Sequence, residues 1–85
     1  MVTQEEFENA VAKSKTLTER PSNEVLLQLY GLYKQATEGD VSAERPGGFD
    51  FKSIAKWDAW FKLKGTPPEV ARGEYVRIME QLASK

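Results

Sequence analysis

The run Tyr30-Gly31-Leu32-Tyr33-Lys34 contains the side chains with the clearest binding chemistry in this sequence. Residues at positions i, i+3 and i+4 of a helix share one face. We therefore expect Tyr30, Tyr33 and Lys34 to point the same way and to offer two phenol groups and one ammonium together. A position at the edge of the core is the other interpretation of two such tyrosines, and the run alone favours it.

Gly31 lies in the middle of this run. A glycine inside a helix costs about 0.5–1 kcal/mol relative to alanine. A close approach of a second helix or of a ligand would account for it, and so would neutral drift. The sequence leaves these explanations open.

A local excess of positive charge follows in residues 52–64, which hold four lysines and one acidic residue. On a chain with a formal net charge of −1, such a patch suits a small polyanion better than a long one. A solvent-exposed helix face explains the charges nearly as well. Lys52 and Lys56 are spaced i and i+4 beside Trp57 and Trp60. Lysines next to an aromatic surface can bind phosphates while the aromatic ring stacks on a nucleotide base. For the tryptophans themselves, a structural role in the core is favoured.

The chemistry of most enzymes is missing from the sequence. It contains no histidine and no cysteine, so the usual general base, thiolate nucleophile and thiolate metal ligand are absent. We find no phosphate-binding loop, dinucleotide fingerprint, EF-hand loop or phosphopantetheine attachment site. The carboxylate pair Glu5/Glu6 is better explained as a favourable interaction with a helix dipole. These observations argue against an enzyme, a metal site and a covalent acyl carrier.

The spacing of apolar residues predicts helices that must position these side chains. The first spans about residues 3–15 and opens with a capping box formed by Thr3 and Glu6. Ser22 or Asn23 can cap a second helix that ends near residue 38, with Gly39 as a left-handed terminator. Its wide apolar face indicates contact with more than one neighbouring element.

Two further helices follow a loop over residues 40–50 that is rich in glycine and proline. Asp50 is a suitable N-cap for a third helix that runs to about Leu63, and Gly65 ends it. Residues 66–69 (TPPE) predict a second capping box with proline at the first helical position. No segment alternates at period two, so the sequence predicts an all-α fold of four helices.

Three stretches, taken together, resemble the acyl-CoA-binding protein family. They are LYGLYKQATEGD (29–40), ERPG (44–47) followed by DFK (50–52), and AKWDAW (55–60) with LKG (63–65). The resemblance covers essentially the whole chain and implies one acyl-CoA-binding domain over residues 1–85. It implies a four-helix bundle of the acyl-CoA-binding protein type, with up-down-down-up order and the shape of a shallow bowl.

The resemblance also implies a role for each candidate site residue. Tyr30, Lys34 and Lys56 would hold the 3′-phosphate of the CoA adenosine, and Tyr33 would lie against the adenine ring. Leu27 would lie along the acyl chain. The remaining implied ligand contacts are Lys15, Lys52 and Tyr75 around the CoA head group, with Gly31 and Leu32 completing the set.

The implied function is a non-catalytic carrier and buffer of medium- to long-chain acyl-CoA esters, with roles in transport and fatty acid metabolism. Acyl-CoA would be the carried ligand, and no cofactor or metal is expected. Burial of each methylene yields roughly 0.8 kcal/mol, so long acyl-CoA should bind better than free CoA or free fatty acid. A helical protein-interaction module is the first alternative, and a thioesterase is the second.

Two positions depart from the family pattern. Ser14 replaces an apolar residue expected to pack on the last helix, which predicts lower stability but intact binding. Gly48 stands before Phe49 where bulkier residues are common, which leaves the local loop conformation open. The contact between the first and last helices would then rest on Phe7, Val11, Leu17, Val76, Met79 and Leu82.

The overall composition sets the remaining expectations. A length of 85 residues with 40% apolar and 11% aromatic residues is typical of one small folded domain. The net charge predicts no general attraction to nucleic acid or anionic membranes. No apolar run approaches the roughly 20 residues that cross a bilayer, and the acidic start lacks the features of a secretory signal. We expect a cytoplasmic monomer without stable membrane association.

Overall fold

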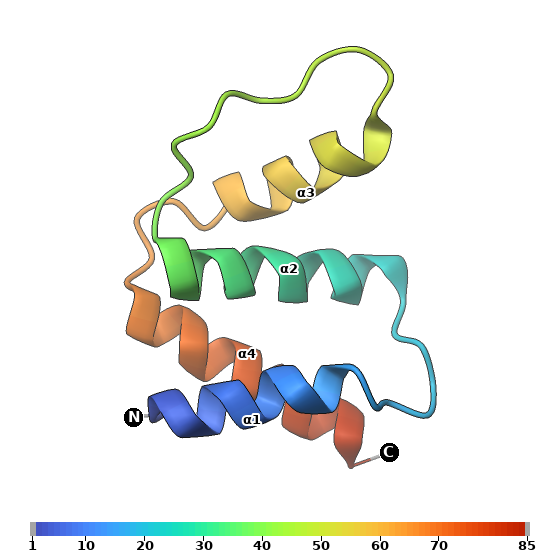
Figure 1. The fold of residues 1–85 in the computed structure, drawn as a ribbon, viewed down its shortest axis with the longest axis vertical. Coiled ribbons are helices and arrows are strands. Elements are labelled where there is room, and N and C mark those ends of the chain that lie inside the picture. The colour runs from blue at the N-terminus through green and yellow to red at the C-terminus, as the bar shows by residue number, and fades with distance from the viewer. Residues whose placement is uncertain (1, 85) are drawn as a thin grey trace.

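The computed structural model describes residues 2–84. Figure 1 shows the four helices in that range, in the order α1 (Gln4–Ser14), α2 (Asn23–Glu38), α3 (Phe51–Phe61) and α4 (Pro68–Ala83). No strand is present among these residues, which agrees with the predicted all-α fold. The third helix ends two residues earlier than expected, because the chain continues as turns over residues 62–65.

The predicted N-caps of the first three helices are confirmed. In each case a side-chain oxygen accepts a hydrogen bond from the backbone N–H three residues further on, which satisfies a donor that the helix leaves free. The bonds run from Glu6 to Thr3 at 3.1 Å, from Val25 to Ser22 at 3.2 Å and from Ser53 to Asp50 at 3.2 Å.

The predicted capping box of the fourth helix is wrong. The N-cap is Pro67, which has no side-chain capping bond, and Thr66 lies one residue too early. A residue before proline is pushed into extended conformations, and Thr66 and Pro67 are both followed by proline. Pro67 is extended accordingly, with φ −60° and ψ 141°. The prediction of proline at the first helical position is confirmed by Pro68.

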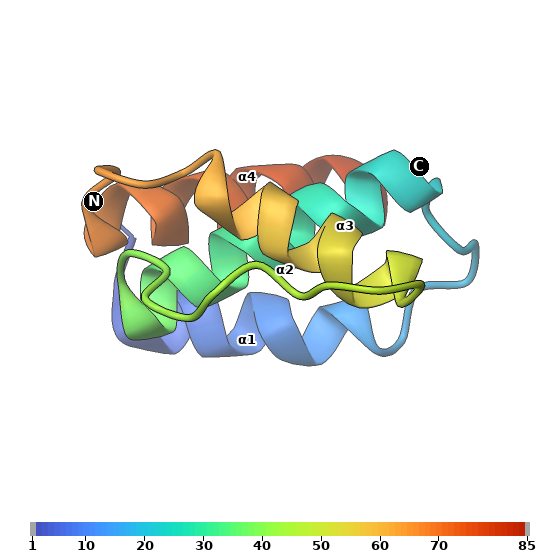
Figure 2. The same ribbon diagram turned by 90° about the horizontal axis from the view of Figure 1, so that it is seen from above.

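The helices form a thin layer with α2 in the middle. It packs against α3 on one side and α4 on the other, and α1 packs against α4. Figures 1 and 2 show α2 and α3 running in the same direction while α1 and α4 run the opposite way, which is the expected up-down-down-up order. The molecule measures 38 × 28 × 15 Å, and Figure 2 shows α1 and α4 at opposite sides of its shortest dimension.

The core lies between α1, α2 and α4. On α4, the side chains of Ala71, Tyr75, Ile78 and Met79 are buried, and Leu82 packs against the core. Ser14 is half-buried, and its hydroxyl donates to the Val11 carbonyl at 2.6 Å. The buried cluster consists of Phe7, Ala10, Leu29, Leu32, Ala36, Ala71, Tyr75, Val76, Ile78 and Met79.

The long loop between α2 and α3 is held by side chains at several points. The Asp40 carboxylate accepts from the Gly65 N–H and from the Gln35 amide, each at 2.8 Å. The Trp57 indole N–H donates to the Ala43 carbonyl at 2.9 Å. Further along, the Arg45 guanidinium binds both carboxylate oxygens of Asp58 at 2.9 and 3.1 Å. The loop is therefore ordered along the outer face of α3.

Glycines with positive φ allow the sharp turns of this loop. Gly39 ends α2 as predicted, with φ 79°, but its ψ of −151° lies outside the left-handed helical region. Gly48 has φ 74°, which side chains larger than glycine rarely adopt. The backbone conformation at Gly48 therefore accounts for glycine at a position where the family resemblance suggests a bulkier residue.

Candidate functional site

Two lysines from adjacent helices lie over aromatic rings where α2 meets α3. The Lys56 ammonium of α3 is 5.4 Å from the ring centre of Tyr30 on α2. Conversely, the Lys34 ammonium of α2 is 5.0 Å from the ring centre of Trp60 on α3. A cation over an aromatic face is attracted by the ring quadrupole. The structure thus places Lys56 against Tyr30 and Lys34 against Trp60, across the same pair of helices.

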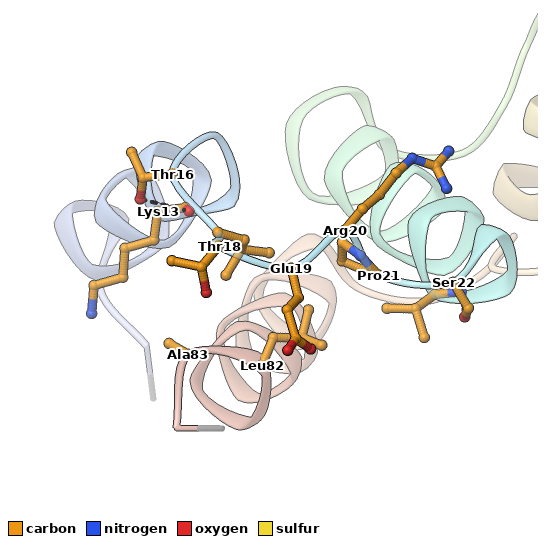
Figure 3. Close-up of a pocket in the computed structure, with 11 residues that line it drawn as sticks. Lys13, Thr16, Thr18, Glu19, Arg20, Pro21, Ser22, Leu82 and Ala83 are labelled. Atoms are coloured by element: carbon orange, nitrogen blue, oxygen red, sulfur yellow. Dashed lines mark hydrogen bonds between the residues drawn. The ribbon is translucent and has the colours of Figure 1, made fainter.

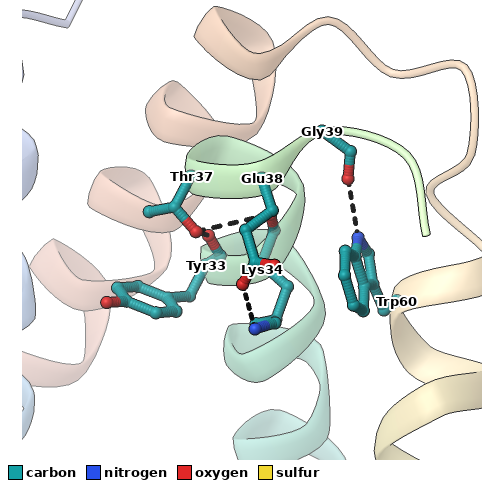
Figure 4. A network of polar contacts seen from close by, with 6 residues as sticks. All are labelled: Tyr33, Lys34, Thr37, Glu38, Gly39 and Trp60. Carbon is teal, nitrogen blue, oxygen red and sulfur yellow. Dashed lines mark hydrogen bonds and ion pairs between the residues drawn. The ribbon is translucent and has the colours of Figure 1, made fainter. Parts of the chain in front are cut away.

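Trp60 is part of this arrangement and is also structural. It is 9% exposed, and its indole N–H donates to the Gly39 carbonyl at 2.8 Å, as Figure 4 shows. The bond fixes the ring beneath Lys34 and ties the end of α2 to α3. This placement agrees with the structural role that the sequence favoured.

Lys34 is also paired with Glu38, one turn further along α2. The hydrogen bond that the Lys34 ammonium donates to the Glu38 carboxylate raises the pKa of Lys34, and partial burial of the ammonium opposes this effect. Lys34 therefore carries a positive charge at neutral pH. An anionic ligand that binds the Lys34 ammonium meets the Glu38 carboxylate beside it.

The side chain of Tyr33 was expected to point the same way as those of Tyr30 and Lys34, but its ring lies in a different environment. Its ring stacks on Phe7 of α1 with centroids 6.1 Å apart, and it lies 6.5 Å from the ring of Tyr75 on α4. Figure 4 shows Tyr33 pointing away from Trp60. Successive helical residues are rotated by about 100°, so Tyr33 and Lys34 diverge by that angle.

The aromatic group of Phe7, Tyr33 and Tyr75 leaves one ring open to solvent. Phe7 and Tyr75 are 2% and 4% exposed, whereas Tyr33 is 39% exposed. A planar ligand can therefore reach the Tyr33 ring but not the body of Tyr75. The structure places Tyr75 in the core, directly behind the exposed tyrosine.

Gly31 and Leu32 are buried inside the protein. A Cβ atom added to Gly31 would lie 2.6 Å from the carbonyl oxygen of Ala59 and 2.9 Å from its carbonyl carbon. The close approach of a second helix, one of the explanations considered for this glycine, is therefore present. Leu32 is 4% exposed and belongs to the core cluster.

Lys15 and Lys52 lie at the ends of two different helices. Lys15 is exposed at the C-cap of α1, and Lys52 is exposed in the first turn of α3. Hydrogen bonds from Ser53 lower the pKa of Asp50, and the nearby charges of Lys56 and Lys52 lower it further. The start of α3 is thus a cationic environment despite its acidic cap.

A groove of about 680 Å³ lies between α2 and α3 and includes Leu27. Its apolar wall comes from Leu27 on α2 and from Ala55, Ala59 and Leu63 on the α3 side. The three α3-side residues were not predicted as site residues. Their spacing of four is the signal that would have placed them on one face. The groove also contains Glu24, Gln28, Asp58 and Lys62.

A second cavity, of about 450 Å³, lies under the connection between α1 and α2 and beside the end of α4 (Figure 3). Its lining is mixed, with Lys13, Glu19 and Arg20 next to Leu82. None of the predicted site residues lines it. Within residues 2–84, no helix is both long and apolar enough to span a membrane, and no three carboxylates gather as a metal site would require.

Comparison with known proteins identifies the family. Residues 4–79 match the family model described as acyl CoA binding protein. An acyl-CoA-binding protein of Dictyostelium discoideum is 49% identical over 93% of this chain and 94% of its own length. Enoyl-CoA delta isomerase 2 of Rattus norvegicus is 52% identical, but this chain spans only 21% of that protein. The crystal structure of Oryza sativa acyl-CoA-binding protein 2 superposes with a TM-score of 0.91 at 49% identity, covering 95% of this chain and 90% of that one. The chain belongs to the acyl-CoA-binding protein family.

Proposed function

We propose that this protein is a non-catalytic carrier that binds medium- to long-chain acyl-CoA esters across α2 and α3. The observation that carries the proposal is that α2 and α3 together hold the contacts of Lys56 with Tyr30 and of Lys34 with Trp60, and also form a groove with an apolar wall. Two ammonium groups and a phenol hydroxyl suit a phosphate monoester, and the groove suits an alkyl chain. The family membership supports the same ligand class.

The 3′-phosphate of the CoA adenosine is assigned to Tyr30, Lys34 and Lys56. Hydrogen bonds from ammonium groups to phosphate are about twice as strong as bonds between neutral groups. Lys34 has to exchange its contact with Glu38 for the phosphate. Lys56 has no ion pair among the described residues, so it is the more available partner.

The adenine ring is assigned to the exposed face of Tyr33, which Phe7 and Tyr75 support from behind. Lys15 and Lys52 are proposed to contact the rest of the CoA head group, since both are exposed cations. Tyr75, Gly31 and Leu32 are buried, so their assigned role is to shape the site from within.

The acyl chain is assigned to the groove beside Leu27. Each buried methylene contributes roughly 0.8 kcal/mol, so affinity should rise with chain length once the head group is fixed. Free fatty acid lacks the phosphates, and free CoA lacks the chain. Both should bind more weakly than the ester.

Isothermal titration calorimetry with palmitoyl-CoA, CoA and palmitate tests this function. We expect one site for palmitoyl-CoA at micromolar protein or below, and much weaker binding of the other two. Absence of heat with palmitoyl-CoA, together with capture of an amphipathic peptide, would favour the protein-interaction alternative. Hydrolysis of the thioester during prolonged incubation would favour the thioesterase alternative.

A further inference from the structure

Among residues 2–84, the two most exposed large apolar side chains lie side by side where the long loop enters α3. Phe49 is 90% exposed and Phe51 is 71% exposed. Their rings form an edge-to-face pair with centroids 6.4 Å apart and an interplanar angle of 71°. Neither belongs to the core cluster or lines a described cavity. Single exposed apolar residues are ordinary, but two adjacent aromatic rings form a patch.

The backbone presents this pair in a fixed way. Asp50, between the two phenylalanines, caps α3 through the Ser53 N–H and also accepts from the Ser53 hydroxyl at 2.8 Å. The Phe51 N–H donates to the Phe49 carbonyl at 3.0 Å, which closes a tight turn before the helix. Gly48, with its positive φ, shapes the turn just before Phe49. The rings therefore project from a structured turn.

The charges around the pair are mainly positive. Lys52 follows Phe51 directly, and Lys56 lies one turn along the same helix. Both lie close enough to Asp50 to lower its pKa. Asp58, a further acidic residue of α3, is neutralised by Arg45. The acidic start of α1 belongs to a helix that makes no contact with α3, and Figure 1 shows the loop and α3 at the end of the molecule opposite the two termini.

We propose that Phe49 and Phe51, with the neighbouring lysines, form a surface that docks reversibly on anionic lipid bilayers. Aromatic rings insert at the level of the lipid headgroups, and flanking lysines are attracted to anionic headgroups. A bilayer, unlike a protein groove, accepts two protruding rings without a complementary shape. The patch is too small for lasting attachment, since stable anchoring requires more than one weak signal. Lys52 and Lys56 belong to this surface and also to the proposed ligand site, so the surface is tested on the protein without acyl-CoA.

Pelleting with sucrose-loaded vesicles tests this surface on the intact protein. The vesicles contain either phosphatidylcholine alone or phosphatidylcholine with phosphatidylserine, at low and high salt. We expect the wild type to pellet with the anionic vesicles at low salt at least tenfold more than with the neutral ones. High salt should reduce that difference, since it screens the lysines.

The matched variants are Phe49→Ala/Phe51→Ala and Val70→Ala. Val70 is also apolar and 50% exposed, but it lies in the first turn of α4. The partition of the double variant to anionic vesicles should be at least tenfold lower than that of the wild type. The partition of Val70→Ala should stay within twofold of the wild type. Circular dichroism of each variant confirms that the helices are intact.

The proposal is overturned if the wild type and the double variant pellet equally, or if the wild type shows no preference for anionic vesicles. In either case, binding measured in vesicle-free buffer shows what the rings do instead. One result would be that the double variant loses more affinity for palmitoyl-CoA than for octanoyl-CoA. That result would assign the rings to the acyl chain. Loss of a concentration-dependent dimer in the double variant, without vesicle binding, would assign them to a second copy of this chain.

Discussion

Gly31 of α2 lies against the backbone of Ala59 on α3 so closely that a side chain at position 31 would overlap the Ala59 carbonyl, 2.6 Å from its oxygen. This contact sets the separation of the two helices that carry the proposed phosphate contacts. The same separation places Lys56 over Tyr30 and forms the groove beside Leu27. The packing of α2 against α3 therefore explains why position 31 holds a glycine, although glycine costs helix stability there.

Gly31→Ala should destabilise the protein and weaken ligand binding together. The obstructing atoms are backbone, which cannot rotate away, and overpacking of this kind costs typically 1–3 kcal/mol. Gly73→Ala is the matched control, because a Cβ there would have only the Val2 side chain near it, at 4.0 Å. That variant should gain about 0.5–1 kcal/mol from helix propensity. Urea unfolding of both variants checks the contrast, and a stable Gly31→Ala protein would contradict it.

Glu38→Gln should tighten the binding of palmitoyl-CoA. The substitution removes a carboxylate that holds the Lys34 ammonium and repels an incoming phosphate. The Glu38 side chain is 52% exposed, and exposed ion pairs contribute about 0.2–1 kcal/mol, so an increase of about two- to fivefold is expected. Calorimetry at low salt measures it, with Glu80→Gln on α4 as the control. Weaker binding of Glu38→Gln would mean that Glu38 positions Lys34 for the ligand.

Asp40→Asn should lower stability at neutral pH but not in acid. The Gly65 N–H, then the Gln35 amide, hold the pKa of Asp40 below its ordinary value of 3.8. A carboxyl group whose pKa is lower in the folded than in the unfolded protein stabilises the native state at pH values above its unfolded pKa. This stabilisation is lost as the pH falls through the pKa of the folded state. The urea midpoints of wild type and Asp40→Asn should therefore differ at pH 7 and converge as the pH falls below 3.8 and through the lowered pKa of Asp40. A difference that persists in acid would show that the substitution acts through the geometry of the Asp40 hydrogen bonds and not through its charge. Glu44→Gln is the control for an exposed carboxylate.

Much of the fold follows from local chemistry that the sequence displays. The caps at Thr3, Ser22 and Asp50 act within three residues of the helix they begin. The failed capping box at Thr66 shows the limit of such patterns, because two successive prolines fix the backbone before any side chain can cap it. The Gln35 amide also donates to the Thr66 carbonyl at 2.8 Å, and the Trp57 indole donates to the Ala43 carbonyl. These bonds join residues 31 and 14 positions apart in the chain, so no local pattern predicts them.

Helical spacing indicates which candidate residues of α2 lie near one another, but not how neighbouring helices arrange them. Helical spacing groups Tyr30, Tyr33 and Lys34, yet the packing of neighbouring helices divides them between two aromatic environments. The exposed phenylalanines at the start of α3 carry no signal in the sequence, since apolar residues beside a helix start are usually buried.

Ser14→Leu should stabilise the protein without changing ligand binding. Ser14 is half-buried near the end of α1, the helix that packs on α4, and its hydroxyl bonds only to its own helix among the described residues. Added apolar surface there should contribute about 1 kcal/mol. Thermal unfolding compares it with Ala12→Leu, an exposed position on the same helix. Equal melting temperatures of the two variants would show that position 14 does not face the core.

The phosphate assignment is tested most directly with palmitoyl-CoA and its 3′-dephospho analogue, titrated into wild type and Lys56→Ala. A hydrogen bond to a charged group contributes about 1.5–3 kcal/mol, so the wild type should bind the dephospho ester at least tenfold more weakly. Lys56→Ala should distinguish the two ligands much less, because it lacks part of the phosphate site. Lys64→Ala, an exposed lysine beyond the end of α3, should behave as wild type. Equal affinity of the wild type for the two esters would contradict the placement of the 3′-phosphate at Tyr30, Lys34 and Lys56.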